Sequence, residues 1–290
     1  MSFPSETQAW KATDIRSDNF DGLQLVEDVP VSTLGDHDVL VQIEAVSLNY
    51  RDLAIPRGLY PFAMKTPVIA GSDSAGTVLA VGPKVTDFTT GDKICTLFNE
   101  LHQTNPITPE AVGSGLGGAV DGTLRKYAVF PDHGLVTAPS TLSSIEASTL
   151  TCASLTAWNA LFGLKKLKAD DWVRIEGTGG FDHILEIGGA ATVAQSLKAI
   201  KPEGLITIIS FLTSAENDKQ PNLMEALNHI CTVRGIFVGS LEQFVEMNRA
   251  IDDWKIKPVV DAKVFRFGEA KMVYEHLWGR MNFGKGIVRI

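Results

Sequence analysis

The residues best suited to chemistry in this 290-residue chain lie between Trp172 and Gly189, in the stretch WVRIEGTGGFDHILEIGG. Because glycine has no side chain, a glycine turn lets the backbone approach a pyrophosphate and direct amide donors at it. Gly177, Gly179 and Gly180 stand where such a turn follows an apolar, strand-like run. This spacing indicates the first strand and turn of a dinucleotide-binding unit.

The segment after Gly180 departs from that fingerprint. A complete site needs a helix that begins at the turn and a selective residue about 20 positions further on that contacts the ribose. Phe181-Asp182 follows instead, and Asp182 adds a negative charge close to the expected phosphate. The run His183–Ile187, which ends in Gly188-Gly189, resembles a later strand of the same sheet. The sequence therefore predicts a nucleotide site that lacks part of its frame.

Metal ligation is not indicated by the cysteines or histidines. The three cysteines, Cys95, Cys152 and Cys231, are widely spaced in apolar surroundings, which is typical of buried thiols, and they form no CxxC pair. The six histidines show neither i,i+4 pairing nor a directly adjacent cysteine; they are His37, His102, His133, His183, His229 and His276. We therefore predict no metal.

Composition limits the partners. There are 26 Lys and Arg against 34 Asp and Glu, a net charge of −8, which argues against nucleic acid as a partner. The first thirty residues lack the apolar core of a signal peptide, and no uncharged apolar run reaches about 18 residues. We expect a soluble, cytoplasmic protein that acts on a small molecule and binds no membrane.

The first 140 residues have the texture of a β domain. Val39–Val46 alternates apolar and polar residues with a period of two, and glycines separate further short runs of this kind. These further runs are Thr77–Val81, Asp92–Leu97, Lys126–Phe130 and Leu135–Thr137. The pattern predicts a rolled or barrel-like β domain.

The second half alternates helices and strands. Ser143 and Glu146 have the spacing of a capping box, and helical spacing follows to Gly163. His183–Ile187, a helix over Ala190–Ile200 and a strand over Leu205–Phe211 form one βαβ unit with parallel strands. The later predicted elements are a helix from Pro221 to Ile230, a strand over Thr232–Phe237, and a helix from the capping box Ser240–Gln243 to Trp254. The last thirty residues return to β texture, and we expect them to pack on the first domain.

Nine segments occur in the order of a known family: LNYRD at Leu48–Asp52, GLYP at Gly58–Pro61, GSDSAGTVLAVG at Gly71–Gly82, GDK at Gly91–Lys93, DGTLRKYAVF at Asp121–Phe130, TAW at Thr156–Trp158, GTGG at Gly177–Gly180, EIGG at Glu186–Gly189 and GKGIVRI at Gly284–Ile290. In this order they resemble the medium-chain dehydrogenase/reductase superfamily, in its zinc-independent branch of quinone oxidoreductases and enoyl reductases. The resemblance covers nearly all of the chain. It implies an α/β-plus-β fold, with a GroES-like β-rich barrel domain at 1–142 and 256–290 and a truncated Rossmann-like domain at 143–255.

The resemblance also implies roles for single residues. Asn49 would orient substrate or nicotinamide, and Tyr60 would be the proton donor or oxyanion partner. Zinc-bearing relatives place a cysteine near Asn49 and a His-Glu pair at Ser72-Asp73, and those ligands are missing here. The residue types alone allow a plainer interpretation, in which Tyr60 is a half-buried packing residue and Arg51-Asp52 is a surface ion pair.

The implied cofactor is NADPH or NADH, with Thr156 on its nicotinamide side. The other implied cofactor-binding positions are Gly177, Gly179, Gly180, Gly188, Gly189, Phe211, Leu212, Phe237, Val238 and Lys285. Taken without the family, strand-end glycines are also ordinary turn residues and Lys285 is also an ordinary solvated lysine.

By the same resemblance, three helices and two strands would stand between Gly180 and Phe181, roughly 70 residues at typical element lengths. The ribose-contacting strand lies in that gap, so the preference between NADPH and NADH cannot be deduced. If Trp172–Glu176 and His183–Ile187 remain parallel, the chain must return about 16 Å within six residues; an antiparallel hairpin is the local alternative. If either strand is reversed, we expect it to be Trp172–Glu176, at an edge of the sheet.

Three functions therefore remain open. The first is an NAD(P)H-dependent, zinc-independent oxidoreductase that reduces a quinone or an activated double bond, with a weakened cofactor site. The second is a non-enzymatic binding or interaction protein, and the third is an incomplete form of such a reductase. A homodimer is a further possibility, because an exposed sheet edge favours self-association.

Overall fold

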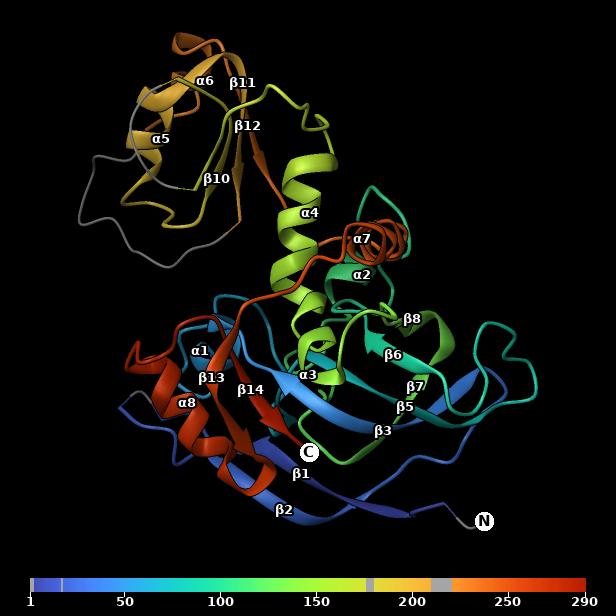
Figure 1. The fold of residues 1–290 in the computed structure, drawn as a ribbon. Coiled ribbons are helices and arrows are strands. Elements are labelled where there is room, and N and C mark those ends of the chain that lie inside the picture. Colours follow the sequence, from blue (N-terminus) through green and yellow to red (C-terminus); the bar gives the residue numbers. More distant parts are fainter. Residues whose placement is uncertain (1–2, 17, 176–179, 210–220) are drawn as a thin grey trace. The chain divides into compact units, whose positions relative to one another are not determined.

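The computed structural model describes residues 3–16, 18–175, 180–209 and 221–290. They form two compact units, one of Met1–Ser154 with Ser240–Ile290 and one of Leu155–Gly239 (Figure 1). The second domain predicted from the sequence, 143–255, contains this second unit and extends beyond it at both ends. The helix after Ser240 belongs to the first unit because Asn248 Nδ2 donates to the carbonyl of Thr137 at 2.9 Å.

The first unit contains two sheets. The larger is mixed, with the strand order β13-β14-β3-β5-β6-β8 and with β7 also paired to β3; the smaller has the order β2-β1-β4. The larger sheet consists of β3 (Asp38–Ser47), β5 (Asp73–Val81), β6 (Lys93–Thr96), β7 (Tyr127–Pro131), β8 (Leu135–Thr137), β13 (Val260–Arg266) and β14 (Lys285–Arg289). The smaller consists of β1 (Glu6–Ala12), β2 (Leu23–Pro30) and β4 (Val68–Ile69). Within the described chain these sheets do not close into a barrel, so the barrel expectation is corrected to an open, GroES-like sheet.

Apolar residues of β3 anchor the core of this unit. Val39 and Val41 are fully buried, and Trp10 packs into the same core while its Nε1 donates to the carbonyl of Phe267 at 2.8 Å. Gly76 permits the close approach of β5 to β3, because a Cβ there would lie 2.3 Å from the carbonyl oxygen of Gln42. The C-terminal β14 pairs antiparallel with β3, which confirms that the tail packs on the first domain.

Short helices and one long helix complete the first unit. The α-helices are α1 (Tyr50–Ala54), α2 (Pro109–Val112), α3 (Ser144–Ala147), α7 (Leu241–Trp254) and α8 (Ala270–Trp278). There are 3₁₀ turns η1 (Asp132–Gly134) and η3 (Phe267–Glu269) and a π turn η2 (Leu150–Ser154). Both predicted capping boxes are present: Glu146 accepts from the Ser143 amide at 2.8 Å and Gln243 from the Ser240 amide at 3.1 Å.

The described residues of the second unit form a four-stranded parallel sheet of order β12-β11-β10-β9. Its strands are β9 (Val173–Arg174), β10 (Phe181–Glu186), β11 (Ile200–Ile208) and β12 (Thr232–Gly235). Its helices are α4 (Leu155–Phe162), α5 (Val193–Ala199) and α6 (Glu225–Asn228). The βαβ unit β10-α5-β11 is therefore confirmed, with a helix shorter than the predicted Ala190–Ile200.

Strand β9 lies at the edge of this sheet and is parallel to β10, with Val173 opposite His183. The antiparallel hairpin that local spacing allowed is therefore not formed. Strand β9 has only two residues. The chain therefore returns only about 10 Å along the sheet, from the level of Arg174 to that of Phe181, a shorter distance than two five-residue strands would require. In β11, pairing begins at Ile200 and not at Leu205, and the register shifts between the two.

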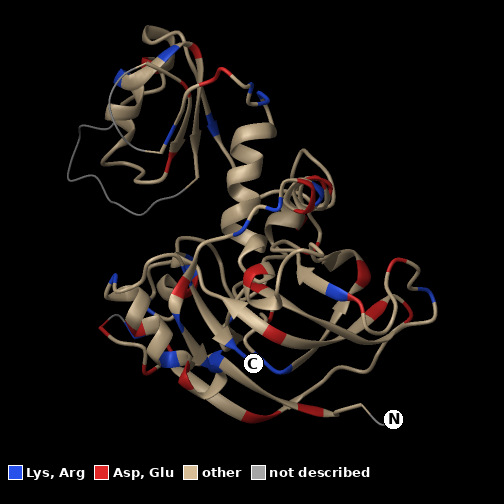
Figure 2. Cartoon of the chain, viewed as in Figure 1, with Lys and Arg blue, Asp and Glu red and all other residues tan. Residues whose placement is uncertain are grey.

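Charged residues of both signs are interspersed along the two units, and the described ribbon carries no continuous basic stretch (Figure 2). Among the described residues, none of the helices has the length and apolarity needed to cross a membrane.

Candidate active site

Asn49 and Lys285, which are far apart in sequence, meet where β3 ends and β14 begins. The amide of Leu48 donates to the carbonyl of Gly286 at 3.0 Å, which extends the pairing of the two strands. Lys285 Nζ donates to the carbonyl of Leu48 at 3.0 Å and to Asn49 Oδ1. The lysine ammonium therefore holds the Asn49 side-chain oxygen in place.

Arg51 and Asp52 are buried, 8% and 2% exposed, so the surface ion pair considered from the sequence is corrected to an internal one. Asp52 Oδ2 accepts from the Asn49 amide at 2.7 Å at the start of α1, and Asp52 Oδ1 lies 3.6 Å from Arg51 Nη1. Burial raises the pKa of Asp52 to about 6, although Arg51 opposes the shift, and Asp73 adds to it. This carboxyl group titrates close to neutral pH.

Arg51 links that carboxyl to Tyr60. Arg51 Nη1 donates to the carbonyl of Leu116 at 2.7 Å, and Arg51 Cζ lies 5.1 Å from the centre of the Tyr60 ring and 4.7 Å from that of Phe98. Burial alone would lower the pKa of Arg51, but Asp52 and then Tyr60 raise it above its usual value. The guanidinium therefore stays charged beside the tyrosine.

Tyr60 also has the packing role that its residue type suggested. It is partly buried and packs on an apolar cluster of Ala12, Ile55 and Val68, and its ring lies 5.4 Å from that of Phe62. The Tyr60 ring therefore contacts apolar residues and also lies against the Arg51 guanidinium. The apolar contacts fix the Tyr60 ring, and the Arg51 guanidinium provides a charged group near it.

Ser72, Asp73 and Cys152 form the next part of the same cluster. The buried Asp73 accepts from Ser72 Oγ at 2.7 Å and from the Cys152 amide at 3.0 Å. Burial raises the pKa of Asp73, and Lys285 opposes this shift. Burial, with Asp73 nearby, raises the pKa of the Cys152 thiol to about 12, so this thiol is protonated at neutral pH.

A cavity of about 270 Å³ opens beside Asn49 and Lys285. Tyr50, Leu53 and Leu277 contribute apolar surface to its lining, and Asn49, Asn282 and Lys285 contribute polar groups. A largely apolar space with a few polar groups is of the kind that holds small ligands. The sequence did not point to Arg51, Asp52, Asp73 or Cys152 as parts of this site, because no local pattern shows that they are buried together.

The nucleotide-side residues lie in the second unit. Thr156 and Asn159 are three residues apart on α4, and Asn159 Nδ2 donates to the carbonyl of Val238 at 2.7 Å, next to Phe237. Thr156 therefore lies on α4, and Val238 is hydrogen-bonded to the same helix. Four of the predicted positions, Gly177, Gly179, Phe211 and Leu212, lie outside the described residues.

The glycine turn after β10 is occupied by a carboxylate. Glu186, which is 1% exposed, accepts from the Gly189 amide at 2.9 Å and from the hydroxyls of Thr192 and Ser196. Gly188 is required here, because a Cβ at that position would lie 2.2 Å from Thr192 Oγ1. The donors at this turn are therefore directed at Glu186.

The first glycine turn and Asp182 are arranged differently. Gly180 has a φ of +78°, which favours glycine, and its amide donates to the carbonyl of Ala199 at 2.8 Å. Asp182 forms an ion pair with Lys201 at 2.8 Å and accepts from the Trp172 amide at 3.0 Å. The negative charge that the sequence placed near a phosphate is therefore compensated within the protein.

Comparison with known proteins shows the family. The Alcohol dehydrogenase GroES-like domain matches residues 35–140, and the Zinc-binding dehydrogenase domain matches residues 163–288. A zinc-type alcohol dehydrogenase-like protein of Schizosaccharomyces pombe is 35% identical over 336 residues, which cover 93% of this chain and 96% of that protein. A chloroplast envelope quinone oxidoreductase homolog of Arabidopsis thaliana is 37% identical over 60% of this chain and 46% of that protein.

Among solved structures, the crystal structure of a candidate alcohol dehydrogenase from Sinorhizobium meliloti 1021 has a TM-score of 0.87 and 31% identity, and it covers all of both chains. This chain therefore belongs to the medium-chain dehydrogenase/reductase family of zinc-type alcohol dehydrogenase-like proteins. The family consists of NAD(P)-dependent dehydrogenases and reductases that act on small molecules.

Proposed function

We propose that this chain is an NAD(P)H-dependent reductase that uses no zinc and delivers hydride to a quinone or an activated double bond. The observation that carries the proposal is the Lys285 ammonium on Asn49 Oδ1. A positive side chain stands where a catalytic zinc would need an electron-rich ligand. Activation of a substrate oxygen then depends on hydrogen-bond donors of the protein.

The donor set around this point does not fit zinc. Zinc binds thiolate, imidazole and carboxylate ligands, whereas Asn49 and Ser72 offer only neutral oxygens, and the Asp73 carboxylate already accepts from Ser72 Oγ and the Cys152 amide. The Cys152 thiol, with its raised pKa, would have to lose a proton beside Asp73. Among the described residues, no group of three or more His, Cys, Asp or Glu side chains could hold a metal ion. This set of donors supports the proposal of a zinc-independent site.

Tyr60 is the proposed proton donor. When bound, NAD(P)H supplies the hydride to the electron-poor carbon of the substrate, and the negative charge develops on the substrate oxygen. The Tyr60 hydroxyl gives its proton to that oxygen, and the Arg51 guanidinium stabilises the phenolate that remains. Asn49 orients the substrate carbonyl.

The cofactor site is proposed to be incomplete. The alignment with the Schizosaccharomyces pombe relative is 336 residues long and includes 93% of this chain, which is about 270 of its 290 residues. About 66 aligned positions therefore have no residue of this chain. This difference supports the internal deletion that the sequence predicts between Gly180 and Phe181. Because Glu186 already takes the donors of the second glycine turn, we expect NADPH or NADH to bind at least tenfold more weakly than to a complete relative.

Steady-state kinetics with the purified chain tests the function. We expect oxidation of NADPH or NADH with p-benzoquinone or an α,β-unsaturated ketone, with no oxidation of ethanol by NAD⁺ and no change after treatment with a chelator. Loss of activity after chelation, restored by zinc, would contradict the zinc-independent site. Micromolar NADPH affinity by calorimetry would contradict the weakened cofactor site.

One observation favours a second candidate, a cytoplasmic binding protein that self-associates. Strand β9 is an edge of its sheet, and Trp172 and Ile175 beside it are 66% and 61% exposed. This protein would be a dimer without reductase activity. Sedimentation of the purified chain together with the kinetic assay separates the two, because a monomer that reduces a quinone excludes the second candidate. The intact mass of the natural protein separates both from an incomplete form.

A further inference from the structure

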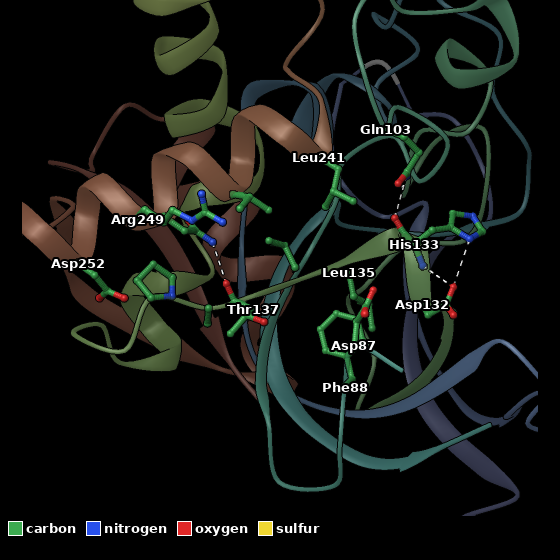
Figure 3. Close-up of a pocket in the computed structure, with 15 residues that line it drawn as sticks. Asp87, Phe88, Gln103, Asp132, His133, Leu135, Thr137, Leu241, Arg249 and Asp252 are labelled. Atoms are coloured by element: carbon green, nitrogen blue, oxygen red, sulfur yellow. Dashed lines mark hydrogen bonds and ion pairs between the residues drawn. The ribbon is translucent and has the colours of Figure 1, made fainter. Parts of the chain in front are cut away.

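The first unit holds a groove of about 450 Å³, apart from the cluster around Asn49 (Figure 3). Helix α7 forms one wall and contributes Leu241, Val245 and Arg249, while strand β8 and the turn at Phe88 form the opposite wall. The groove shares no lining residue with the cavity beside Asn49. Its volume lies within the range of about 300–1,000 Å³ of small-molecule sites.

The floor of the groove is apolar and elongated. Phe88, Leu135 and Val136 are 6%, 2% and 5% exposed, so they present a fixed hydrocarbon surface. From Leu241 to Arg249 the helix extends about 12 Å at a rise of 1.5 Å per residue. An unbranched apolar chain of moderate length fits along that wall.

Two of the carboxylates in the wall are already satisfied. Asp252 accepts from the amides of Ser140 and Thr141 at 3.0 and 2.9 Å. Asp132 accepts from the His133 amide at 2.7 Å and lies 3.2 Å from His37 Nδ1. These donors satisfy the hydrogen-bonding capacity of both carboxylates, which keep their negative charge.

Arg249 carries a charge that the protein does not compensate. Its side chain is exposed, and no described carboxylate lies within ion-pair distance of it. Figure 3 shows Arg249 on the α7 wall, whereas Asp87 and Asp132 lie toward the other end of the groove. Asp252, on the Arg249 side of the groove, accepts from the amides of Ser140 and Thr141 and forms no ion pair with Arg249, so this end offers an unpaired guanidinium, while Asp87 and Asp132 disfavour an anion at the other end.

We propose that this groove binds an amphiphilic monocarboxylate, with its carboxylate on Arg249 and its alkyl chain along Val245 and Leu241. A guanidinium pairs with a carboxylate through charge-assisted hydrogen bonds, and the apolar floor removes the chain from water. A dicarboxylate of the same length is disfavoured, because its second charge meets Asp87 and Asp132. The site is separate from the proposed reductase site and does not depend on it.

Calorimetry with octanoate, octanedioate and 1-octanol tests the proposal on the full chain. We expect saturable binding of octanoate with one site per chain, and binding of octanedioate and 1-octanol that is about tenfold weaker. Arg249→Gln is expected to weaken octanoate binding about tenfold and to leave 1-octanol binding unchanged. Val245→Glu, which places a carboxylate in the apolar part of the α7 wall, is expected to abolish the binding of both octanoate and 1-octanol.

Arg280→Gln is the matched control, because Arg280 is an exposed arginine outside the groove. It is expected to bind octanoate like the unchanged chain, and circular dichroism confirms that each variant is folded. The proposal is overturned if Arg249→Gln retains full octanoate affinity, if Val245→Glu binds as before, or if the unchanged chain shows no saturable binding. Equal affinity for octanoate and 1-octanol would likewise remove the role of Arg249.

Discussion

Asp52 is held between two opposed effects, burial and the neighbouring Arg51. The folded-state pKa of about 6 lies above the ordinary value of 3.8, so burial outweighs the ion pair and the folded protein binds a proton more readily than the unfolded chain. A group of this kind makes the protein less stable as pH rises between the two values, and its cost is fully present above about pH 6. The carboxylate is therefore retained at the expense of stability.

Asp52→Asn tests this balance, because asparagine keeps an acceptor for the Asn49 amide and does not titrate. The free energy of unfolding of the unchanged chain, relative to the variant, should fall by up to about 3 kcal/mol as pH rises from about 4 to 7. Urea unfolding at several pH values measures the difference. A difference that stays constant or grows with pH would mean that Arg51 stabilises the carboxylate more than burial disfavours it.

Tyr60→Phe separates the two roles of that side chain. Phenylalanine keeps the ring over Arg51 and the packing on Ile55, so we expect a stability change below about 1 kcal/mol. Removal of the hydroxyl should lower kcat for quinone or enone reduction by about 10²-fold with little change in the KM for NADPH. Tyr127→Phe, on β7, is the matched control and should retain kcat. An unchanged kcat in Tyr60→Phe would exclude Tyr60 as the proton donor.

At the scale of elements, the turn between β10 and α5 is closed by Glu186. Its carboxylate accepts from Gly189, Thr192 and Ser196, and it thereby serves the start of the helix in the way a bound anion would. This arrangement stabilises the βα turn without a cofactor. It also leaves fewer free donors for a pyrophosphate.

Glu186→Gln should destabilise this turn. The glutamine side chain keeps one acceptor oxygen but loses the negative charge and the second acceptor. For a buried group with charge-assisted hydrogen bonds, we expect this loss to lower the free energy of unfolding by about 1–3 kcal/mol. Hydrogen exchange is expected to show faster exchange in α5 and β10, with unchanged exchange in β3 and β5. Glu275→Gln on the exposed face of α8 serves as the control. Unchanged protection of α5 would show that the carboxylate does not hold the turn.

The range of an interaction along the chain decided whether the sequence could predict it. The capping box of Ser240 and Gln243 spans three residues, so its pattern alone identified the start of α7. The parallel β10-α5-β11 unit followed from local periodicity and handedness. The burial of Arg51 depends on the carbonyl of Leu116, 65 residues away, and no local pattern reports such a contact. An acidic residue three positions before Gly189 was a local signal for the Glu186 turn that went unused.

At the scale of the whole molecule, the proposed reaction site combines residues from the N-terminal and the C-terminal segments of the first unit. Lys285 reaches Asn49 across 236 residues because β14 returns to β3, and the sequence had assigned this lysine only to the cofactor. Asn49, Arg51, Asp73 and Lys285 all lie in the first unit. The proposed deletion would lie in the second unit, so we expect it to leave the proposed proton-donating side intact and to affect the cofactor-binding side.

This separation predicts the behaviour of a chimera. Insertion between Gly180 and Phe181 of the roughly 66 residues that the Schizosaccharomyces pombe relative has in addition should restore a helix after the glycine turn and a ribose-contacting strand. The NADPH affinity should rise at least tenfold by calorimetry, while the effect of Tyr60→Phe on kcat stays the same in both backgrounds. An insert of equal length and Gly/Ser composition is the control and should not raise affinity. If the Gly/Ser insert raises the NADPH affinity, or if the native insert leaves it unchanged, then loss of the pyrophosphate helix does not limit cofactor binding. The backbone and hydroxyl donors that Glu186 occupies are then the next cause to test.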